Sequence, residues 1–229
     1  MSPHDLSADL IADDDEARHR DAPTASCCSV VAAEGRQLKW RAVVFLSMIG
    51  LGHAFNYDFP GSIGTGHHNS IESRFLDHGK AYTQEMNQAL YSVYSWPNTV
   101  LALFGGLLID KYIGLRKSTI LFSSLVLVGS IIFYFGVVST QYWMLIIGRI
   151  VFGLGGESLS VAQSAACARW FNCGRGIALA FGIAVSFARV GSSCNFLVSP
   201  MIATDHGITI AALTGSFACV FSLIATVGL

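Results

Sequence analysis

Six long apolar runs constrain this chain more than any other feature. Each contains about 20 residues with few charges, the length that a helix needs to cross about 30 Å of hydrocarbon. The composition agrees, because only 13% of the residues are charged, against about 25% in an ordinary soluble domain. We therefore predict an all-α membrane protein with six transmembrane helices. These predicted helices lie near 39–59, 88–110, 118–138, 142–168, 175–200 and 207–229.

The chain before the first apolar run has a different composition. Residues 1–37 contain eight acidic residues and few large apolar ones, so they cannot bury enough surface to form a core. We predict a disordered acidic tail over 1–37, followed by a six-helix transmembrane bundle over 38–229. The one long connection, 60–87, is polar. Because the last run is still apolar at its end, we expect the chain to be part of a longer one.

The positions of Lys and Arg predict the orientation, since cytoplasmic loops carry an excess of both. Eight of them flank the tail, the second connection or the fourth connection: Arg36, Lys39, Arg41, Lys111, Arg116, Lys117, Arg169 and Arg175. On the other side, only Arg74 and Lys80 lie in a connection. We therefore predict that the N-terminus is cytosolic and that 60–87 is a luminal loop. A net charge of −1 leaves no basic surface for nucleic acid.

Two charges lie near the middle of predicted helices, Glu157 in the fourth and Arg189 in the fifth. A charge at the bilayer centre costs about 2.5–3.5 kcal/mol on insertion scales, so both should face protein or a water-filled cavity. Small and polar residues extend from each charge at helical spacing: Gly153, Ser160 and Ser164 from Glu157, and Gly182, Ser186 and Ser193 from Arg189. Two interpretations stay open, a structural salt bridge between the helices and a binding site for a ligand that carries both charges.

A third charge, Arg149, lies about seven residues from the outer end of the fourth predicted helix. Its long side chain is expected either to extend to the membrane surface or to reach Asp58 at the outer end of the first helix. For Arg149 and Asp58, a structural or gating role is favoured over contact with a ligand.

The connection between the second and third helices carries a recognisable motif. Residues 105–117 read GGLLIDKYIGLRK, which resembles the G-x-x-x-D-[RK]-x-G-[RK]-[RK] signature of the major facilitator superfamily. The matching residues, which the resemblance implies act in gating, are Gly106, Asp110, Lys111, Gly114, Arg116 and Lys117. One extra residue precedes Gly114 and Leu115 follows it, so Asp110 carries over more firmly than the basic pair.

Further blocks resemble one subgroup of that superfamily, carriers that export dipeptides from the lysosome. In chain order they read NYDFP, YSWPN, FGGLLID, GRIVFGLGGESLSVAQ and FARVGSS. The resemblance implies the N-terminal half of a twelve-helix carrier, built from two inverted three-helix repeats. The first and fourth helices should then line a cavity at the bilayer midplane.

The resemblance also implies a function and partners. Such carriers move dipeptides containing Lys, Arg or His from the lumen to the cytosol by facilitated diffusion, a uniporter mechanism with alternating access. A glycosylated single-pass accessory subunit is an implied partner, and a homodimer is a further one. Glu157 would take the ammonium of the dipeptide and Arg189 its carboxylate. Tyr57 and Tyr94 would form walls of the site, although for either one alone core packing is the favoured role.

Other hypotheses remain beside the dipeptide carrier. One is a carrier for another small zwitterion or anion, with proton coupling through Glu157 as a variant. Another is a membrane scaffold that transports nothing. An enzyme, a cofactor and a bound metal are not expected, because no nucleophile–base or metal-ligand spacing is present. His67, His68 and His78 in the outer loop would gain charge at lysosomal pH, and metal binding by His67 and His68 is a weaker interpretation.

Overall fold

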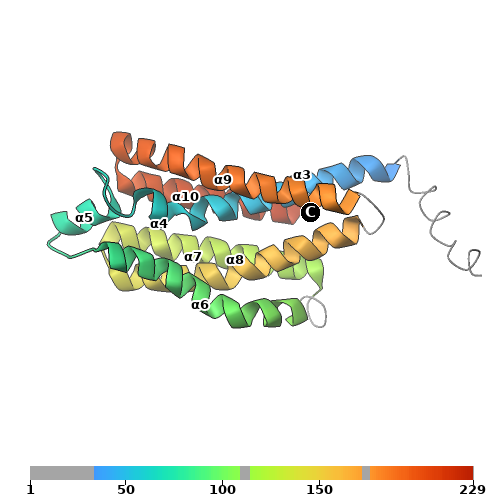
Figure 1. Cartoon of the computed structure of the whole chain (residues 1–229), viewed down its shortest axis with the longest axis horizontal. Helices are drawn as coiled ribbons and strands as arrows, with labels where there is room; N and C mark the ends of the chain where they lie inside the picture. The colour runs from blue at the N-terminus through green and yellow to red at the C-terminus, as the bar shows by residue number, and fades with distance from the viewer. Residues whose placement is uncertain (1–33, 109–113, 172–175, 229) are drawn as a thin grey trace, which may run out of the picture. The chain divides into compact units, whose positions relative to one another are not determined.

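The computed structural model describes residues 34–108, 114–171 and 176–228, and every regular element in these ranges is helical (Figure 1). The helices are α3 Glu34–Tyr57, α4 Phe59–Ile63, α5 Ile71–Asp77, α6 Gln84–Leu108, α7 Leu115–Ser139, α8 Tyr142–Trp170, α9 Gly176–His206 and α10 Ile208–Gly228. The chain divides into two compact units, Met1–Arg41 and Ala42–Leu229. All contacts described below lie within the second unit. Residues 1–33 of the predicted tail lie outside the described ranges.

The six long helices correspond to the six predicted spans, with ends that differ by up to six residues. The largest difference is at α9, which continues through Pro200 to His206 instead of ending near 200. Among the described helices, α7 to α10 are long and apolar enough to cross a membrane by length and composition. α3 and α6 have 24 and 25 residues, and each begins with a short polar stretch before its apolar part.

Helices α7 and α8 pack with their backbones in close contact, and glycine makes this possible. A Cβ on Gly129 of α7 would lie 2.7 Å from the Cα of Phe152, and one on Gly148 of α8 would lie 2.7 Å from the amide nitrogen of Phe133. Small residues allow this approach in membrane helices, where packing rather than the hydrophobic effect holds helices together.

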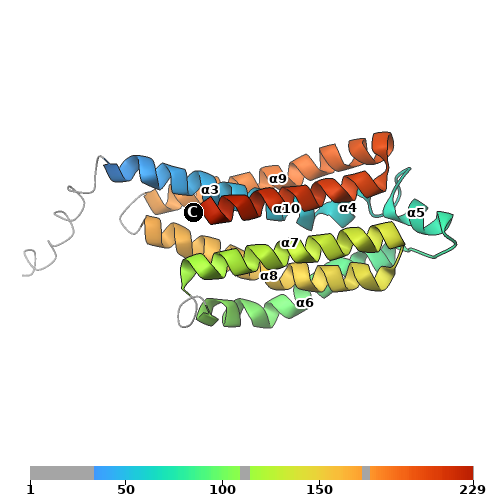
Figure 2. The ribbon, with the colours of Figure 1, turned by 180° about the vertical axis from the view of Figure 1, so that it is seen from behind.

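A buried polar network joins α3, α7 and α10. The Asn56 amide of α3 donates to Ser130 Oγ of α7 at 2.7 Å, and Ser130 Oγ lies 3.0 Å from Ser216 Oγ of α10. All three side chains are buried. α7 and α10 therefore lie side by side (Figure 2), and these interhelical hydrogen bonds fix their register against α3.

The loop predicted over 60–87 contains two short helices. α3 breaks at Asp58, and α4 follows at once with Pro60 in its first turn. Pro60 has no N–H to continue the α3 ladder, and the amides of Gly61 and Ser62 bond instead to the Asp58 carbonyl at 3.0 and 3.1 Å. Ser70 caps the start of α5, and its hydroxyl accepts a hydrogen bond from the Ser73 amide.

The two basic residues of this loop bind the end of α7. Arg74 donates to the carbonyls of Val137 and Val138 at 3.0 and 3.2 Å, and Lys80 Nζ donates to the carbonyl of Thr140 at 2.7 Å. These carbonyls belong to the last turn of a helix, where no intrahelical N–H reaches them. Arg74 and Lys80 therefore anchor the loop by satisfying the negative end of α7.

Candidate functional site

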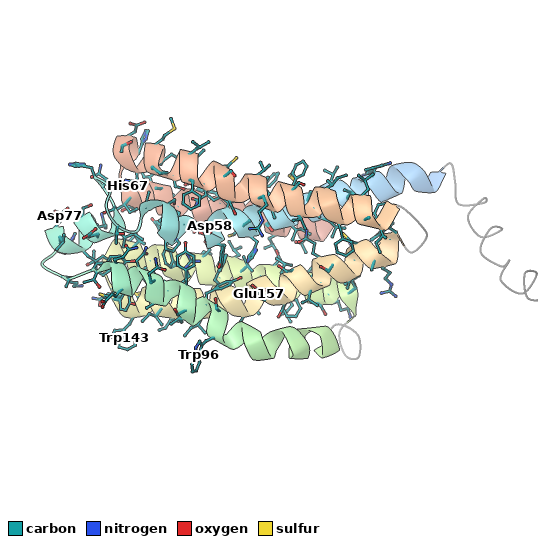
Figure 3. The ribbon with its side chains drawn as sticks, viewed as in Figure 1. Asp58, His67, Asp77, Trp96, Trp143 and Glu157 are labelled. Atoms are coloured by element: carbon teal, nitrogen blue, oxygen red, sulfur yellow. The ribbon has the colours of Figure 1, made fainter. Side chains whose placement is uncertain are left out.

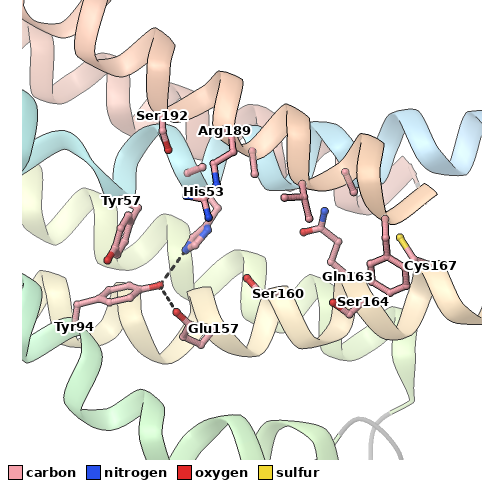
Figure 4. A pocket seen from close by; sticks show the side chains of 15 residues that line it. His53, Tyr57, Tyr94, Glu157, Ser160, Gln163, Ser164, Cys167, Arg189 and Ser192 are labelled. Carbon is pink, nitrogen blue, oxygen red and sulfur yellow. Dashed lines mark hydrogen bonds between the residues drawn. The ribbon is translucent and has the colours of Figure 1, made fainter. Parts of the chain in front are cut away.

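A cavity of about 390 Å³ opens among α3, α6, α8 and α9. Its volume lies in the range of small-molecule sites. The four residues predicted to bind substrate, Tyr57, Tyr94, Glu157 and Arg189, all line it (Figure 4). α3 and α8, the first and fourth long helices, both contribute, as the repeat architecture predicts, and α9 contributes a third wall. Glu157 lies midway along the bundle (Figure 3).

On α8 the residues that line the cavity largely match the predicted stripe, and on α9 they match it only in part. Glu157, Ser160 and Ser164 line the cavity, whereas a Cβ on Gly153 would lie 2.8 Å from the Tyr94 carbonyl. On α9 only Arg189 of the predicted stripe lines the cavity, beside Val185, Ala188 and Ser192, whereas Gly182, Ser186 and Ser193 do not line it. Arg189 lies at the edge of both faces, since a helix turns by about 100° per residue.

The carboxylate of Glu157 is held by a short hydrogen-bonded chain. The Tyr94 hydroxyl lies 3.3 Å from Glu157 Oε1 and 3.3 Å from His53 Nε2. A tyrosine hydroxyl has one proton, and an ionised carboxylate only accepts. With Glu157 ionised, Tyr94 therefore donates to Glu157, and His53 Nε2 carries a proton and donates to Tyr94. Among the described residues, no side chain or backbone group bonds the second oxygen, Oε2.

Sequence reasoning missed His53, although a signal for it was present. His53 is an ionisable residue inside a predicted transmembrane helix, which alone marks a functional candidate, and it lies one turn before Tyr57. Its ring stacks on Phe152 with centroids 5.3 Å apart. The space for this ring comes from Gly156, where an added Cβ would meet the His53 ring and lie 2.9 Å from Tyr94 Oη.

Glu157 and Arg189 face the same cavity without pairing. Within the described ranges, no ion pair with N···O of 4.0 Å or less joins them. Arg189 points from α9 toward the cavity that Glu157 borders from α8 (Figure 4). The salt bridge expected in one interpretation is therefore not formed in this structure, and both charges stay available to a third group.

The Arg149 side chain lies in neither of the two positions expected from the sequence. Its side chain is buried, 3% exposed, and it forms no ion pair with Asp58 in the described part of the chain. Instead Nη2 donates to the Tyr57 carbonyl at 2.9 Å. The break at Asp58 explains this, because the Gly61 amide that would ordinarily bond Tyr57 turns to Asp58.

Aromatic rings surround the buried guanidinium of Arg149. Its central carbon lies 5.2 Å from the ring centroid of Phe133 and 5.6 Å from those of Tyr91 and Phe152. Cation–π contacts of this kind stabilise a desolvated guanidinium. Arg149 does not line the cavity, but it fixes the backbone of Tyr57, which does.

The predicted gating residues are only partly described. Asp110 and Lys111 lie outside the described ranges, and Gly106 lies in the last turns of α6. Gly114 precedes α7 with φ +79°, a left-handed conformation that favours glycine. Arg116 donates to the Val227 carbonyl at 3.4 Å, and Lys117 is exposed. Their part in gating stays a prediction.

Metal binding finds no support in the described residues. No cluster of three His, Cys, Asp or Glu side chains there could hold a metal ion. His67 lies in the loop end of the bundle, apart from the cavity (Figure 3).

The fold and the site together define a multi-pass, all-helical membrane protein with a charged cavity at the middle of its bundle. The sequence matches the family model of the Major Facilitator Superfamily over residues 37–229. The chain belongs to this superfamily.

Comparison with known proteins agrees with the subgroup that the sequence motifs indicate. The chain is similar to proteins named lysosomal dipeptide transporter MFSD1: 35% identical to that of Homo sapiens over 96% of this chain, and 37% identical to that of Danio rerio over 80%. It spans 48% and 40% of those relatives' lengths. Among solved structures, the peptide transporter POT bound to sulfate matches with TM-score 0.65 and 12% identity, covering 83% of this chain and 37% of POT. POT bound to alafosfalin gives 0.60 and 14%, with the same coverage. These similarities confirm the fold of one half of a carrier.

Proposed function

We propose that this chain forms part of a carrier for dipeptides, and that Glu157 and Arg189 bind the two ends of one dipeptide. The observation that carries the proposal is an acid and a base that face one cavity of about 390 Å³ without pairing. A dipeptide has a free ammonium and a free carboxylate, so it neutralises both charges at once. The name of the similar proteins, lysosomal dipeptide transporter, supports the same substrate class.

Each charge has the geometry that its proposed partner needs. Tyr94 occupies Glu157 Oε1 and leaves Oε2 toward the ammonium. The Arg189 guanidinium is planar with parallel N–H groups, which suits bidentate binding of a carboxylate. In a cavity from which water is displaced, both interactions strengthen. Peptides with a blocked end leave one charge unpaired, and that charge then disfavours binding.

The proposal extends to location and direction. We place the protein in the lysosomal membrane with its N-terminus in the cytosol, moving dipeptides that contain Lys, Arg or His out of the lumen by facilitated diffusion. The similar proteins' name supports the organelle, and the excess of Lys and Arg on one side supports the orientation. The implied accessory subunit and the homodimer remain part of this proposal.

Uptake into proteoliposomes tests the proposal. We expect the full-length protein to accumulate a labelled dipeptide by exchange at equal pH on both sides, and to ignore the same peptide with its N-terminus acetylated or its C-terminus amidated. Glu157→Gln should abolish uptake, and Glu85→Gln, which removes an exposed charge at the start of α6, should not. Equal uptake of free and blocked peptides would contradict the proposal.

The chain from His53 through Tyr94 to Glu157 favours one alternative, a proton-coupled carrier of small zwitterions. If Glu157 takes up a proton and the proton of His53 moves from Nε2 to Nδ1, the hydrogen bonds can reverse: Glu157 donates to Tyr94 and Tyr94 donates to His53 Nε2. Buried acid and histidine chains of this kind serve as proton relays. Uptake that depends on an imposed pH gradient, and that loses this dependence in Tyr94→Phe, would support the alternative over facilitated diffusion.

A further inference from the structure

The start of α7 and the ends of α8 and α10 lie at the same end of the bundle (Figure 2). A second pocket lies among them. Its volume is about 260 Å³. Its lining residues come from all three helices: Leu115, Arg116, Thr119, Ala166, Arg169, Trp170 and Thr226. None of them lines the central cavity, so this pocket is a separate site.

The pocket has an apolar floor. Thr119, Ala166 and Thr226 are buried, with exposed fractions of 1%, 0% and 1%. The Thr119 hydroxyl donates to the Leu115 carbonyl at 2.7 Å, and the Thr226 hydroxyl donates to the Ser222 carbonyl at 2.9 Å. Because both hydroxyl protons are already engaged, these two threonines offer the pocket no free hydroxyl donor.

The rim, in contrast, is positive. Arg116 and Arg169 are both exposed at the mouth of the pocket, and none of the lining residues in the described part of the chain is acidic. Arg116 uses one N–H for the Val227 carbonyl at 3.4 Å, and a guanidinium has five. Two arginines whose remaining N–H groups bond no other described residue match the several oxygens of a phosphate. Trp170, half-buried beside them, is a residue type enriched where membrane meets water.

We propose that Arg116 and Arg169 bind the phosphate of an anionic phospholipid whose apolar part enters the floor of this pocket. A free phosphate would satisfy the rim but leave the floor unfilled, so it should bind more weakly. Basic pockets between membrane helices recognise lipid headgroups through the same combination of charge and apolar contact. A lipid bound here would bridge the ends of α7 and α8.

Titration of the purified full-length protein in neutral detergent tests this site. The probes are dihexanoyl phosphatidylglycerol, dihexanoyl phosphatidylcholine and inorganic phosphate, with binding followed by native mass spectrometry. We expect saturable binding of phosphatidylglycerol, at least about tenfold tighter than either other probe. Arg116→Gln and Arg169→Gln should each weaken it by about tenfold or more, the effect of losing charge-assisted hydrogen bonds.

Lys117→Gln is the matched control. Lys117 is exposed in the same turn as Arg116 but does not line the pocket, so its loss should weaken binding by no more than about fivefold, the effect of one nearby surface charge. An equal loss in Lys117→Gln and Arg116→Gln would overturn the proposal in favour of diffuse attraction. Inorganic phosphate that binds as tightly as phosphatidylglycerol would overturn the lipid assignment. If Arg116→Gln unfolds because its bond to Val227 is lost, Arg169→Gln decides alone.

Discussion

The hydroxyl of Tyr94 lies 3.3 Å from Oε1 of Glu157, and this contact orients a carboxylate that lines the central cavity. Tyr94 itself is 2% exposed, so packing against neighbouring side chains fixes the position of its ring. The carboxylate therefore borders the cavity with Oε1 held by Tyr94, while no other described residue bonds Oε2.

Tyr94→Phe removes this hydroxyl and keeps the ring. We expect dipeptide affinity to fall by about tenfold or more, because a hydrogen bond to a charged group contributes about 1.5–3 kcal/mol. The melting temperature should change little, since the ring contacts with Tyr57 and Phe152, with centroids 4.8 and 5.9 Å away, persist. Isothermal titration calorimetry checks the affinity.

The matched control is Tyr142→Phe. It removes a hydroxyl that bonds the Met86 carbonyl at 3.0 Å, outside the central cavity. Its affinity for dipeptide should stay within about twofold of wild type, because only a structural bond is lost. Equal losses of affinity in the two variants would show that Tyr94 acts through stability alone.

Gly156→Ala tests whether the site depends on the space that glycine leaves at this position. The added Cβ would meet the ring of His53 and lie 2.9 Å from Tyr94 Oη, so overpacking should cost about 1–3 kcal/mol of stability. Gly182→Ala on α9 is the control, because a Cβ there meets nothing within 4 Å. It should be neutral or stabilise by about 0.5–1 kcal/mol. Thermal unfolding of both variants measures the difference, and similar melting temperatures would refute this role for Gly156.

Much of this site could be predicted because burying a charge is so costly. Glu157 and Arg189 are conspicuous in apolar sequence, and helical spacing places them at similar depth, so the sequence predicts that they lie near one another but leaves open whether they pair. The position of His53 near these two charges could not be predicted from residue spacing, since it depends on how α3 is rotated relative to Gly156. The direction of the Arg149 side chain could not be predicted either, because it depends on the Tyr57 carbonyl, which becomes free only where α3 breaks.

Arg149→Lys probes the link between that break and the cavity. Lysine keeps the charge but loses the planar group that both stacks on three rings and donates to the Tyr57 carbonyl. We expect a loss of about 1–3 kcal/mol in stability, together with weaker dipeptide binding because the Tyr57 backbone is no longer held. Melting and calorimetry report the two effects separately. A destabilised variant with unchanged affinity would mean that Arg149 supports the fold without positioning Tyr57.

The loop anchor at the end of α7 predicts opposite effects at the two ends of one helix. Lys80→Gln removes a cation from the C-terminal carbonyl of Thr140 and should cost about 0.3–1 kcal/mol. Lys117→Gln removes a cation from the first turn of the same helix, where the dipole disfavours it, and should be neutral or slightly stabilising. Hydrogen exchange over 71–77 should accelerate only in Lys80→Gln. Unchanged exchange there would show that the loop is held by its other contacts.

The assignment of Glu157 to the ammonium and Arg189 to the carboxylate predicts a specific pattern in a double cycle. Glu157→Gln keeps the size of the side chain and removes its charge, and the variant should fold because a neutral group costs less to bury. N-acetylation of a dipeptide should weaken binding to wild type by about tenfold or more, yet weaken binding to Glu157→Gln by little more than twofold, since the charge pair is already lost. Amidation of the C-terminus should behave in the same way with Arg189→Gln and should still be costly in Glu157→Gln. If N-acetylation costs the same in wild type and in Glu157→Gln, then Glu157 does not bind the ammonium, and the dipeptide lies in the cavity in the reverse orientation or elsewhere.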